Sequence, residues 1–96
     1  VLGTSLDKDI GAIVREIAPA ADHVIVARSR HPRAAPVELL LERCRGQIAS
    51  LAAAPDIASA LEMALARAGE EDLICITGSL FAMAEAREAF GLRSIL

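Results

Sequence analysis

Two short apolar runs, set among helical patterns, constrain the fold of this chain more than any other feature of its sequence. Residues 23–27 read HVIVA and residues 72–77 read DLICIT. Continuous runs of this length, rich in β-branched residues, are typical of strands buried on both faces of a parallel sheet. Apolar residues recur at helical spacing on either side of each run. This alternation predicts an α/β fold, a three-layer sandwich around a mostly parallel sheet.

Weaker signals complete the expected order of elements. The opening VLG and the segment QIASLAA at residues 47–53 are further strand candidates. Helices are expected to begin near Asp7 or Asp9, Pro36, Asp56 and Ser79, because each of these residues suits a helix cap or first turn. Proline or glycine follows each helical pattern and ends it. The apolar side chains expected to face the core from the first three helices are Ile10, Ile13, Val14, Ile17, Val37, Leu40, Leu41, Cys44, Ile57, Leu61 and Leu65.

The composition predicts an aliphatic core. The chain has 96 residues, enough for one domain, and is 54% hydrophobic but only 2% aromatic. Phe81 and Phe90 are therefore expected to be the only rings in the core. Cys44 and Cys75 both lie in apolar patterns, so we expect two buried free thiols and neither a disulfide nor a metal pair. Free thiols suit a reducing compartment, such as the cytoplasm.

Charge and hydropathy argue against several classes of partner. A formal net charge of −3 does not suit a nucleic-acid binder that works through bulk positive charge. The chain has no run of about eighteen apolar residues, so neither a transmembrane helix nor a membrane partner is expected. Its start does not resemble a signal peptide, because Asp7 and Asp9 interrupt it. These observations predict a cytoplasmic protein.

The expected topology also predicts where a ligand binds. In open α/β sheets, ligands bind beyond the carboxyl ends of the strands. That rule selects the loops at residues 4–9, 28–35, 52–55 and 77–79, of which three are polar. The candidate functional groups are therefore expected to gather on one edge of the sheet.

Lys8, the only lysine of the chain, lies between Asp7 and Asp9 in the first of these loops. As a compact point charge, it suits a carboxylate or phosphate ligand. It also suits an exposed loop in which it pairs weakly with a neighbouring acid. The sequence leaves both interpretations open.

The second loop, RSRHPRA, brings Arg30, His31 and Arg33 together in an acidic chain. Arginine forks suit carboxylate or phosphate recognition, so one interpretation is an anion clamp. The other is a solvated loop that balances nearby acids. No partner carboxylate of His31 can be identified from the sequence, so a general base is not predicted there. His23, at the start of a strand, is predicted to be structural.

The third loop, Thr77-Gly78-Ser79, joins a predicted strand to a predicted helix. Gly78 would let the backbone approach a ligand closely, and the helix N-terminus offers free amides and the positive end of the helix dipole. Ser79 is predicted to cap the helix or to bind a ligand carboxylate, two roles that use the same oxygen. The sequence has no GxxxxGK[ST], GxGxxG or GxSxG motif, and no cluster of metal ligands. It offers recognition groups without a catalytic set.

Together these segments resemble a known family. Residues 1–36 and residues 72–88 are similar to the C-terminal domain of folylpolyglutamate synthase/dihydrofolate synthase, in the Mur ligase superfamily. Three motifs in register carry the resemblance: G-x-x-x-D-K-D, R-x-x-x-P-R-A and I-T-G-S-L-x-x-x-x-E-A-R-E. It implies the Rossmann-like sheet of Mur ligase C-terminal domains.

The resemblance also implies an activity, that of an ATP-dependent amide ligase. Such enzymes activate a substrate carboxylate as an acyl phosphate, which the amine of glutamate then attacks. The substrate would be dihydropteroate or a reduced folate. In the superfamily, the C-terminal domain closes over the ATP site of the central domain and helps bind the incoming amino acid. Carried over, the substrate-binding residues would be Lys8 and Ser79, which would hold carboxylates of glutamate, with Thr77, Gly78, Asp7, Arg30, His31 and Arg33 as further candidates.

The family's ATP-binding parts do not occur in these residues. Its phosphate loop belongs to a central domain, and its Asp-Gly-Ala-His-Asn stretch would precede residue 1. We therefore expect residues 1–96 to form a single, N-terminally truncated domain that lacks its first strand and helix. ATP and Mg would belong to the full-length enzyme, whose central ATPase domain would be the partner. The fragment alone is predicted to be inactive, and its open sheet edge to favour an edge-strand dimer in a crystal.

Other interpretations stay open beside this one. The chain could belong to another Mur-type amide ligase, or could be a non-catalytic module that binds a nucleotide or sugar phosphate with the same three loops. A phospho-receiver is disfavoured, because none of the predicted strands ends in an acceptor aspartate.

Overall fold

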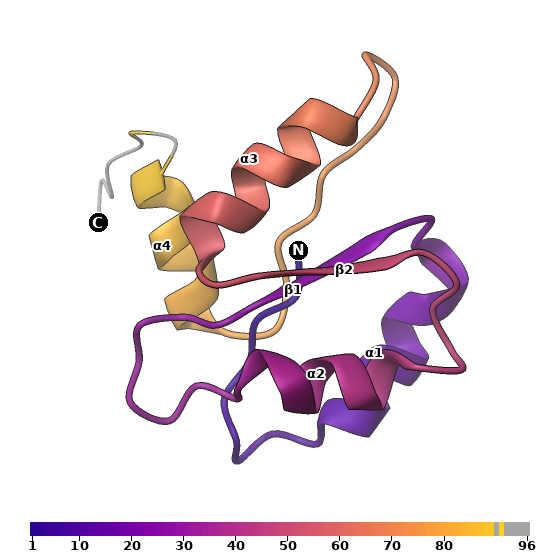
Figure 1. Ribbon diagram of the computed structural model, residues 1–96. Helices are drawn as coiled ribbons and strands as arrows, with labels where there is room; N and C mark the ends of the chain where they lie inside the picture. Colours follow the sequence, from indigo (N-terminus) through magenta and orange to yellow (C-terminus); the bar gives the residue numbers. More distant parts are fainter. Residues whose placement is uncertain (90, 92–96) are drawn as a thin grey trace.

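The computed structural model describes residues 1–89 and 91, and it shows the α/β class that the alternation predicts. Two helices cover one face of a short sheet and two cover the other (Figure 1). The elements in chain order are α1 (Ile10–Ile17), a 3-10 turn (Ala18–Ala20), β1 (Val24–Ala27), α2 (Val37–Cys44), β2 (Leu51–Ala54), α3 (Ile57–Arg67) and α4 (Leu80–Ala89).

The two named strands, β1 and β2, pair in parallel. Their register runs from Val24 opposite Leu51 to Ala27 opposite Ala54. All four residues of β1 are buried, as expected of a strand with helices on both faces. The weak strand candidate at residues 47–53 is therefore confirmed for its last three residues, and the strong one at residues 23–27 for Val24–Ala27.

Leu2 extends the sheet on the other side of β1. It forms parallel bridges with both Val26 and Thr77. The Gly3 amide donates to the Thr77 carbonyl over 3.1 Å, and the Thr77 amide donates to the Val1 carbonyl over 3.0 Å. The order across the sheet is thus residues 75–77, residues 1–3, β1 and β2. The first residues of the chain lie inside the sheet and separate β1 from the segment that precedes α4.

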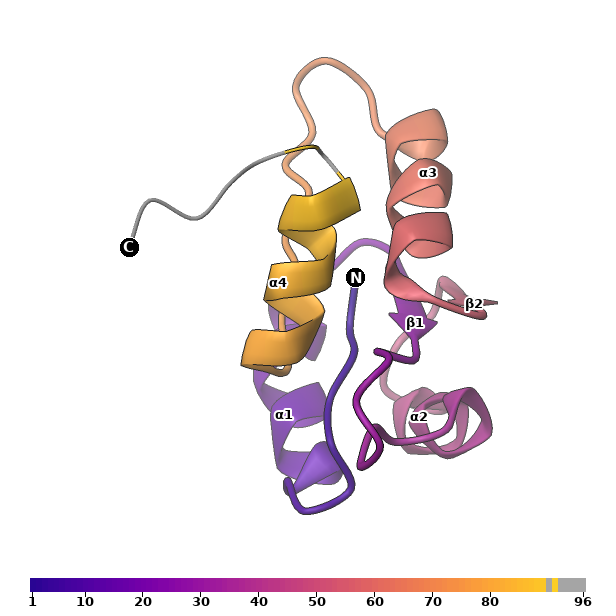
Figure 2. The same ribbon diagram turned by 90° about the vertical axis from the view of Figure 1, so that its left-hand side faces the viewer.

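Two cores form on the two faces of the sheet, and Figure 2 shows the helices that lie on either side of the strands. Successive strand residues point to opposite faces. Val24 and Val26 therefore pack on one side with residues of α1 and α2, such as Val14 and Leu40. Ile25 and Ala27 pack on the other side with residues of α3 and α4. Together the two cores give the three layers that the sequence predicts.

Side-chain caps from Asp9, Asp56 and Ser79 fix the starts of α1, α3 and α4, where the sequence predicts them. Asp9 accepts a hydrogen bond from the Ala12 amide at the start of α1, over 3.0 Å. Asp56 accepts one from the Ser59 amide at the start of α3, over 2.7 Å. Each cap satisfies an amide that the helix itself leaves without a partner.

The prediction of a buried strand at residues 72–77 is wrong for most of that segment. Of these residues, only Thr77 forms a bridge, and Leu73 is 87% exposed. The segment lies at the edge of the described sheet, and its pairing begins only at Cys75, whose carbonyl accepts from the Val1 amine. Cys75 is accordingly exposed, against our expectation, whereas Cys44 is buried; both are free thiols.

Two expected core side chains are also exposed. Leu65 is 52% exposed, although Ile57 and Leu61 are buried. Eight residues on from Ile57, a helix has turned about 80° past a whole number of turns, which carries Leu65 off the buried face. Phe81 is 51% exposed, because its ring lies against a loop and not in the core. Phe90 lies outside the described residues.

Within residues 1–89 and 91, every helix is too short or too polar to traverse a lipid bilayer.

Candidate functional site

Hydrogen bonds join the three polar loops at the carboxyl ends of the strands. The Thr4 hydroxyl donates to the Gly78 carbonyl over 3.0 Å. The Leu6 amide donates to the Arg33 carbonyl over 2.8 Å, and the Ala35 amide donates to the Thr4 carbonyl over the same distance. The loop at residues 4–9 therefore touches both other loops, so all three lie on one edge of the sheet. We call this edge, made of residues 4–9, 28–35 and 77–79, the loop edge.

At Gly78, the main chain of the third loop packs directly against the main chain of Gly3. The φ of Gly78 is +119°, a conformation that side-chain-bearing residues rarely adopt. A Cβ atom at this position would overlap the carbonyl oxygen of Gly3. Glycine is therefore required both by the turn and by the contact between two main chains, and the close approach that the sequence assigns to a ligand is made here by Gly3.

Ser79 caps α4. Its Oγ accepts a hydrogen bond from the Ala82 amide over 3.1 Å, which confirms the capping half of the prediction. An accepting hydroxyl oxygen keeps its own proton free to donate to an anion. Thr77, beside it, takes part through its main chain, which pairs with Val1 and Gly3. The two residues thus place a hydroxyl at the N-terminus of a ten-residue helix.

Asp7 and Lys8 lie exposed in the first loop. A hydrogen bond with the Ser5 side chain, the Asp7 amide, and then the charges of Arg33 and Lys8 lower the pKa of the Asp7 carboxyl. Lys8 lines a shallow hollow of about 440 Å³ with Arg15 and Arg43, on the side of α1 and α2. Ser79 does not line this hollow, so the two predicted carboxylate-binding residues are joined through the Thr4–Gly78 contact and not directly.

Arg30 is held by two acids of α4. Its amide donates to both carboxylate oxygens of Glu85, each over 3.0 Å. Its guanidinium lies 3.4 Å from Glu85 Oε1 and pairs with Glu88. The hydrogen bond with Glu88, and then the charges of Glu88 and Glu85, raise the pKa of Arg30. Glu85 and Glu88 thus partly offset the positive charge of this loop. This agrees with the second interpretation of the sequence, a loop that balances nearby acids.

His31 and Arg33 are shaped by the same loop. The His31 ring stacks on Phe81 with 4.0 Å between centroids and 32° between planes. Nδ1 of His31 accepts from the Arg33 amide over 3.1 Å, so the neutral ring carries its proton on Nε2. The buried Ser29 hydroxyl accepts from the His31 amide over 3.3 Å. Hydrogen bonds within the loop fix its shape, and the His31 ring packs it against Phe81 of α4.

The sequence did not single out Glu85, Glu88 or Phe81, which contact the loop edge from α4. The two acids lie three residues apart in the E-A-R-E segment, a spacing that places both on one face of a helix. That spacing in the sequence indicates that the two acids face the same neighbour. Their partner Arg30 lies 55 residues away in sequence from Glu85, and only the fold brings them together.

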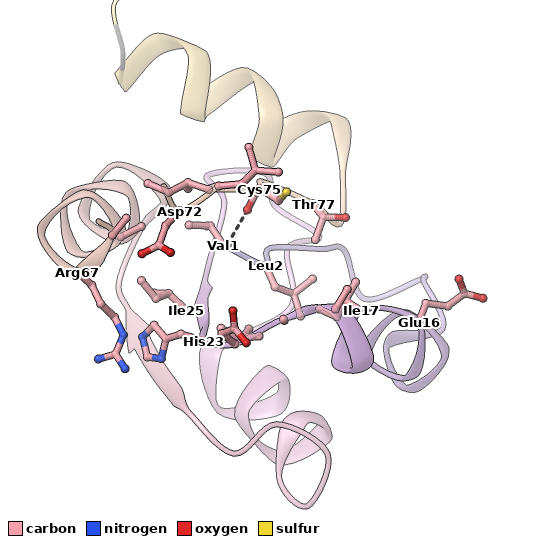
Figure 3. Close-up of a pocket in the computed structure, with 18 residues that line it drawn as sticks. Val1, Leu2, Glu16, Ile17, His23, Ile25, Arg67, Asp72, Cys75 and Thr77 are labelled. Atoms are coloured by element: carbon pink, nitrogen blue, oxygen red, sulfur yellow. Dashed lines mark hydrogen bonds between the residues drawn. The ribbon is translucent and has the colours of Figure 1, made fainter. Parts of the chain in front are cut away.

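A larger hollow lies at the opposite end of the sheet. Its volume is about 540 Å³, and its lining includes Val1, His23, Arg67 and Cys75 (Figure 3). His23 Nδ1 lies 2.6 Å from the Ser50 hydroxyl, which links the starts of β1 and β2. Burial, followed by the charge of Arg67, lowers the pKa of His23. Thr77 lines this hollow and also belongs to the loop edge, so the two regions meet at that residue, whereas no residue of the loops at residues 4–9 and 28–35 lines the hollow.

Neither a cluster of metal ligands nor a phosphate loop is found in the described residues. Residues 1–89 and 91 contain no group of three His, Cys, Asp or Glu side chains placed to hold a metal. The sequence also lacks the phosphate-binding motif that would cradle a triphosphate.

Comparison with known proteins agrees with this fold. The family model described as Mur ligase, glutamate ligase domain, matches residues 1–80. Folylpolyglutamate synthase of Mycobacterium tuberculosis, solved with ADP and AMPPCP, superposes with a TM-score of 0.85 at 29% identity. The bifunctional folylpolyglutamate synthase/dihydrofolate synthase of Yersinia pestis c092, solved with AMPPNP and a Mn ion, gives a TM-score of 0.86 at 26% identity.

In both comparisons, 96% of this chain is covered. The match spans only 23% of the Mycobacterium tuberculosis chain and 22% of the Yersinia pestis chain. A comparison with curated protein sequences gave no match. The family match covers most of the chain and agrees with the resemblance carried by the three loops. This chain therefore belongs to the glutamate ligase domain family of the Mur ligases.

Proposed function

We propose that this chain works as the C-terminal, glutamate-binding and closing domain of a larger ATP-dependent ligase, which joins glutamate to dihydropteroate or a reduced folate through an acyl phosphate. The observation that carries the proposal is the Thr4–Gly78 hydrogen bond, because it joins the Lys8 loop to the Ser79 loop. Two groups suited to carboxylates thereby share one edge, in a fold that matches folylpolyglutamate synthases over 96% of this chain.

In this proposal, glutamate is held by charge and by helix geometry. The Lys8 ammonium attracts one carboxylate. The Ser79 hydroxyl and the first amides of α4 suit another, because free amides and the helix dipole favour an anion there. Gly78 and Thr77 fix the turn that presents Ser79. Asp7, His31 and Arg33 are proposed as supporting contacts, and Arg30 as the link between their loop and α4.

ATP and Mg are proposed to bind a central domain of the same ligase, in the cytoplasm. Among residues 1–89 and 91, no three His, Cys, Asp or Glu side chains are placed to hold a metal ion. The role proposed for the loop edge is to bring glutamate to the acyl phosphate when the two domains close. The partner of this chain is then the ATPase domain, with glutamate and the folate as substrates.

The test is an assay of ADP release by the full-length protein that carries these residues, with ATP, glutamate and either a reduced folate or dihydropteroate. Release is expected to depend on both glutamate and the pterin. Lys8→Ala is expected to raise the KM for glutamate at least tenfold. Arg45→Ala, which removes a positive charge from the end of α2 outside the loop edge, is the matched control and should stay within twofold.

Other outcomes would redirect the proposal. Release that depends on a different amino acid or a different acid substrate would indicate another Mur-type amide ligase. Tight binding of a nucleotide or sugar phosphate by the loop edge, without pterin-dependent release, would indicate a non-catalytic binding module. Normal kinetics of Lys8→Ala would keep the ligase and remove Lys8 from the glutamate site.

A further inference from the structure

Glu85 is the one acid of α4 that contacts both the main chain and the side chain of the loop after β1. Its two carboxylate oxygens accept from the single amide of Arg30, each over 3.0 Å. The guanidinium of the same arginine approaches Glu85 Oε1 to 3.4 Å, and the Glu85 side chain is only 12% exposed. The fold covers most of this side chain, so its carboxylate gains from the amide and the guanidinium of Arg30 as hydrogen-bonding partners.

Glu88 offers an internal comparison on the same helix. It pairs with the Arg30 guanidinium but not with the main chain, and its side chain is 64% exposed. An exposed pair of this kind contributes little to holding a backbone in place. Glu85 therefore makes the main contact between α4 and the main chain of the loop. The stacking of Phe81 on His31 is a second contact between the same two segments.

The same helix carries Ser79 as its cap. Because α4 is a continuous helix, the positions of Ser79 and Glu85 are fixed relative to each other. Holding the Arg30 amide on Glu85 therefore fixes the distance between the Ser79 hydroxyl and the residues that follow Arg30, namely His31 and Arg33. Without Glu85 the loop keeps its internal hydrogen bonds and the stacking of His31 on Phe81, but its main chain is no longer bonded to α4.

We infer that Glu85 is a positioning residue, whose carboxylate clamps the main chain of the loop at residues 28–33 onto α4 and so sets the place of His31 and Arg33 relative to Ser79 for glutamate binding. This inference rests on the proposed function. Glu85 itself touches no substrate in this scheme.

The test compares three variants of the full-length ligase with the parent. Glu85→Ala removes the clamp and is expected to raise the KM for glutamate about tenfold, with kcat within threefold of the parent. Glu85→Gln keeps one oxygen that can accept from the Arg30 amide, so a rise of about threefold is expected. Glu88→Ala removes the exposed partner only and should stay within twofold.

Hydrogen exchange, followed by mass spectrometry, supplies a readout that does not need activity. Peptides covering residues 28–34 are expected to exchange faster in Glu85→Ala than in the parent or in Glu88→Ala, with little change elsewhere. Should Glu85→Ala fail to fold, Glu85→Gln carries both measurements, because it keeps the volume of the side chain.

Each outcome separates the two claims. A parent without glutamate-dependent ADP release overturns the proposed function, and with it the role of Glu85 toward glutamate. An active parent whose Glu85→Ala and Glu85→Gln variants keep the KM for glutamate, while the loop exchanges faster, overturns the inference and leaves the proposed function intact. A raised KM in both variants, graded as above and absent in Glu88→Ala, supports it.

Discussion

The hydroxyl of Thr4 donates a hydrogen bond to the carbonyl of Gly78, 3.0 Å away and 74 residues later in the chain. Thr4 is only 2% exposed, so both partners depend on each other for hydrogen bonding. The bond joins two loops that leave the sheet at neighbouring strands.

Replacing Thr4 with valine keeps the shape of the side chain but removes the donor. The Gly78 carbonyl then loses its partner in a partly buried place, so we expect the free energy of unfolding to fall by about 1–2 kcal/mol. Thr4→Ser, which keeps the hydroxyl, should lose clearly less. Urea denaturation of the variants measures both values. Equal losses in valine and serine variants would show that the methyl group matters and the hydrogen bond does not.

Gly78→Ala should destabilise the fold more than a strained φ alone explains. The added Cβ would both adopt an unfavourable conformation at φ +119° and overlap the Gly3 carbonyl. We expect a loss of at least about 2 kcal/mol. Gly46→Ala is the matched control, because Gly46 has φ +83° and no atom within 4 Å of an added Cβ. A loss of about 1 kcal/mol is expected there. Similar losses at both positions would show that the contact with Gly3 is not rigid.

Two substitutions separate the capping role of Ser79 from its proposed role in binding. Ser79→Ala removes the acceptor for the Ala82 amide and should cost about 1 kcal/mol of stability. Ser79→Asp keeps an acceptor and should stay close to the parent in stability. Its negative charge would repel a glutamate carboxylate, so the KM for glutamate should rise more in the aspartate variant than in the alanine variant. The opposite order would place glutamate elsewhere.

Asp56 makes stability depend on pH in the acid range. The Ser59 amide, followed by the Ser59 side chain, lowers the pKa of the Asp56 carboxyl from its ordinary 3.8. The carboxylate therefore stabilises the fold above about pH 4, and this contribution is lost as the pH falls through the lower pKa of the folded state. Asp56→Asn should show a smaller fall in Tm between pH 5 and pH 2.5 than the parent. Glu62→Gln, on the exposed face of α3, controls for the lost charge, and an identical fall in the parent and Asp56→Asn would contradict this assignment.

The two thiols should differ sharply in reactivity in the 96-residue chain. Cys75 is exposed, whereas Cys44 is buried and burial raises its pKa. An aromatic disulfide reagent should therefore modify one thiol per native chain and two per chain unfolded in urea. The Cys75→Ser variant should show almost no fast reaction, and fast modification of that variant would indicate that the α2 side of the core opens readily.

How far the sequence predicts this molecule depends on how local each feature is. The caps of α1, α3 and α4, the buried β1 and the order of the helices all rest on neighbouring residues, and the sequence predicts them. The buried strand at residues 72–77 fails because burial depends on what lies beside it. An apolar run reports its own preference but not its place at the edge of the described sheet.

The candidate site shows the same division. The rule that ligands bind beyond strand ends was enough to select loops that the structure does bring together. It could not pair Arg30 with Glu85, because that contact joins segments 55 residues apart. Nor could it show that Lys8 borders a hollow that Ser79 does not line, since both are simply polar loop residues in the sequence.

The place of Leu2 between Val26 and Thr77 has a consequence for synthesis on the ribosome. A nascent chain that has not yet emerged beyond residue 75 has residues 1–3 paired along one side only. The loop edge then lacks its third loop, because Gly78 and Ser79 are still in the exit tunnel. The third loop therefore joins the other two late, when residues 75–79 meet residues 1–4 across the sheet.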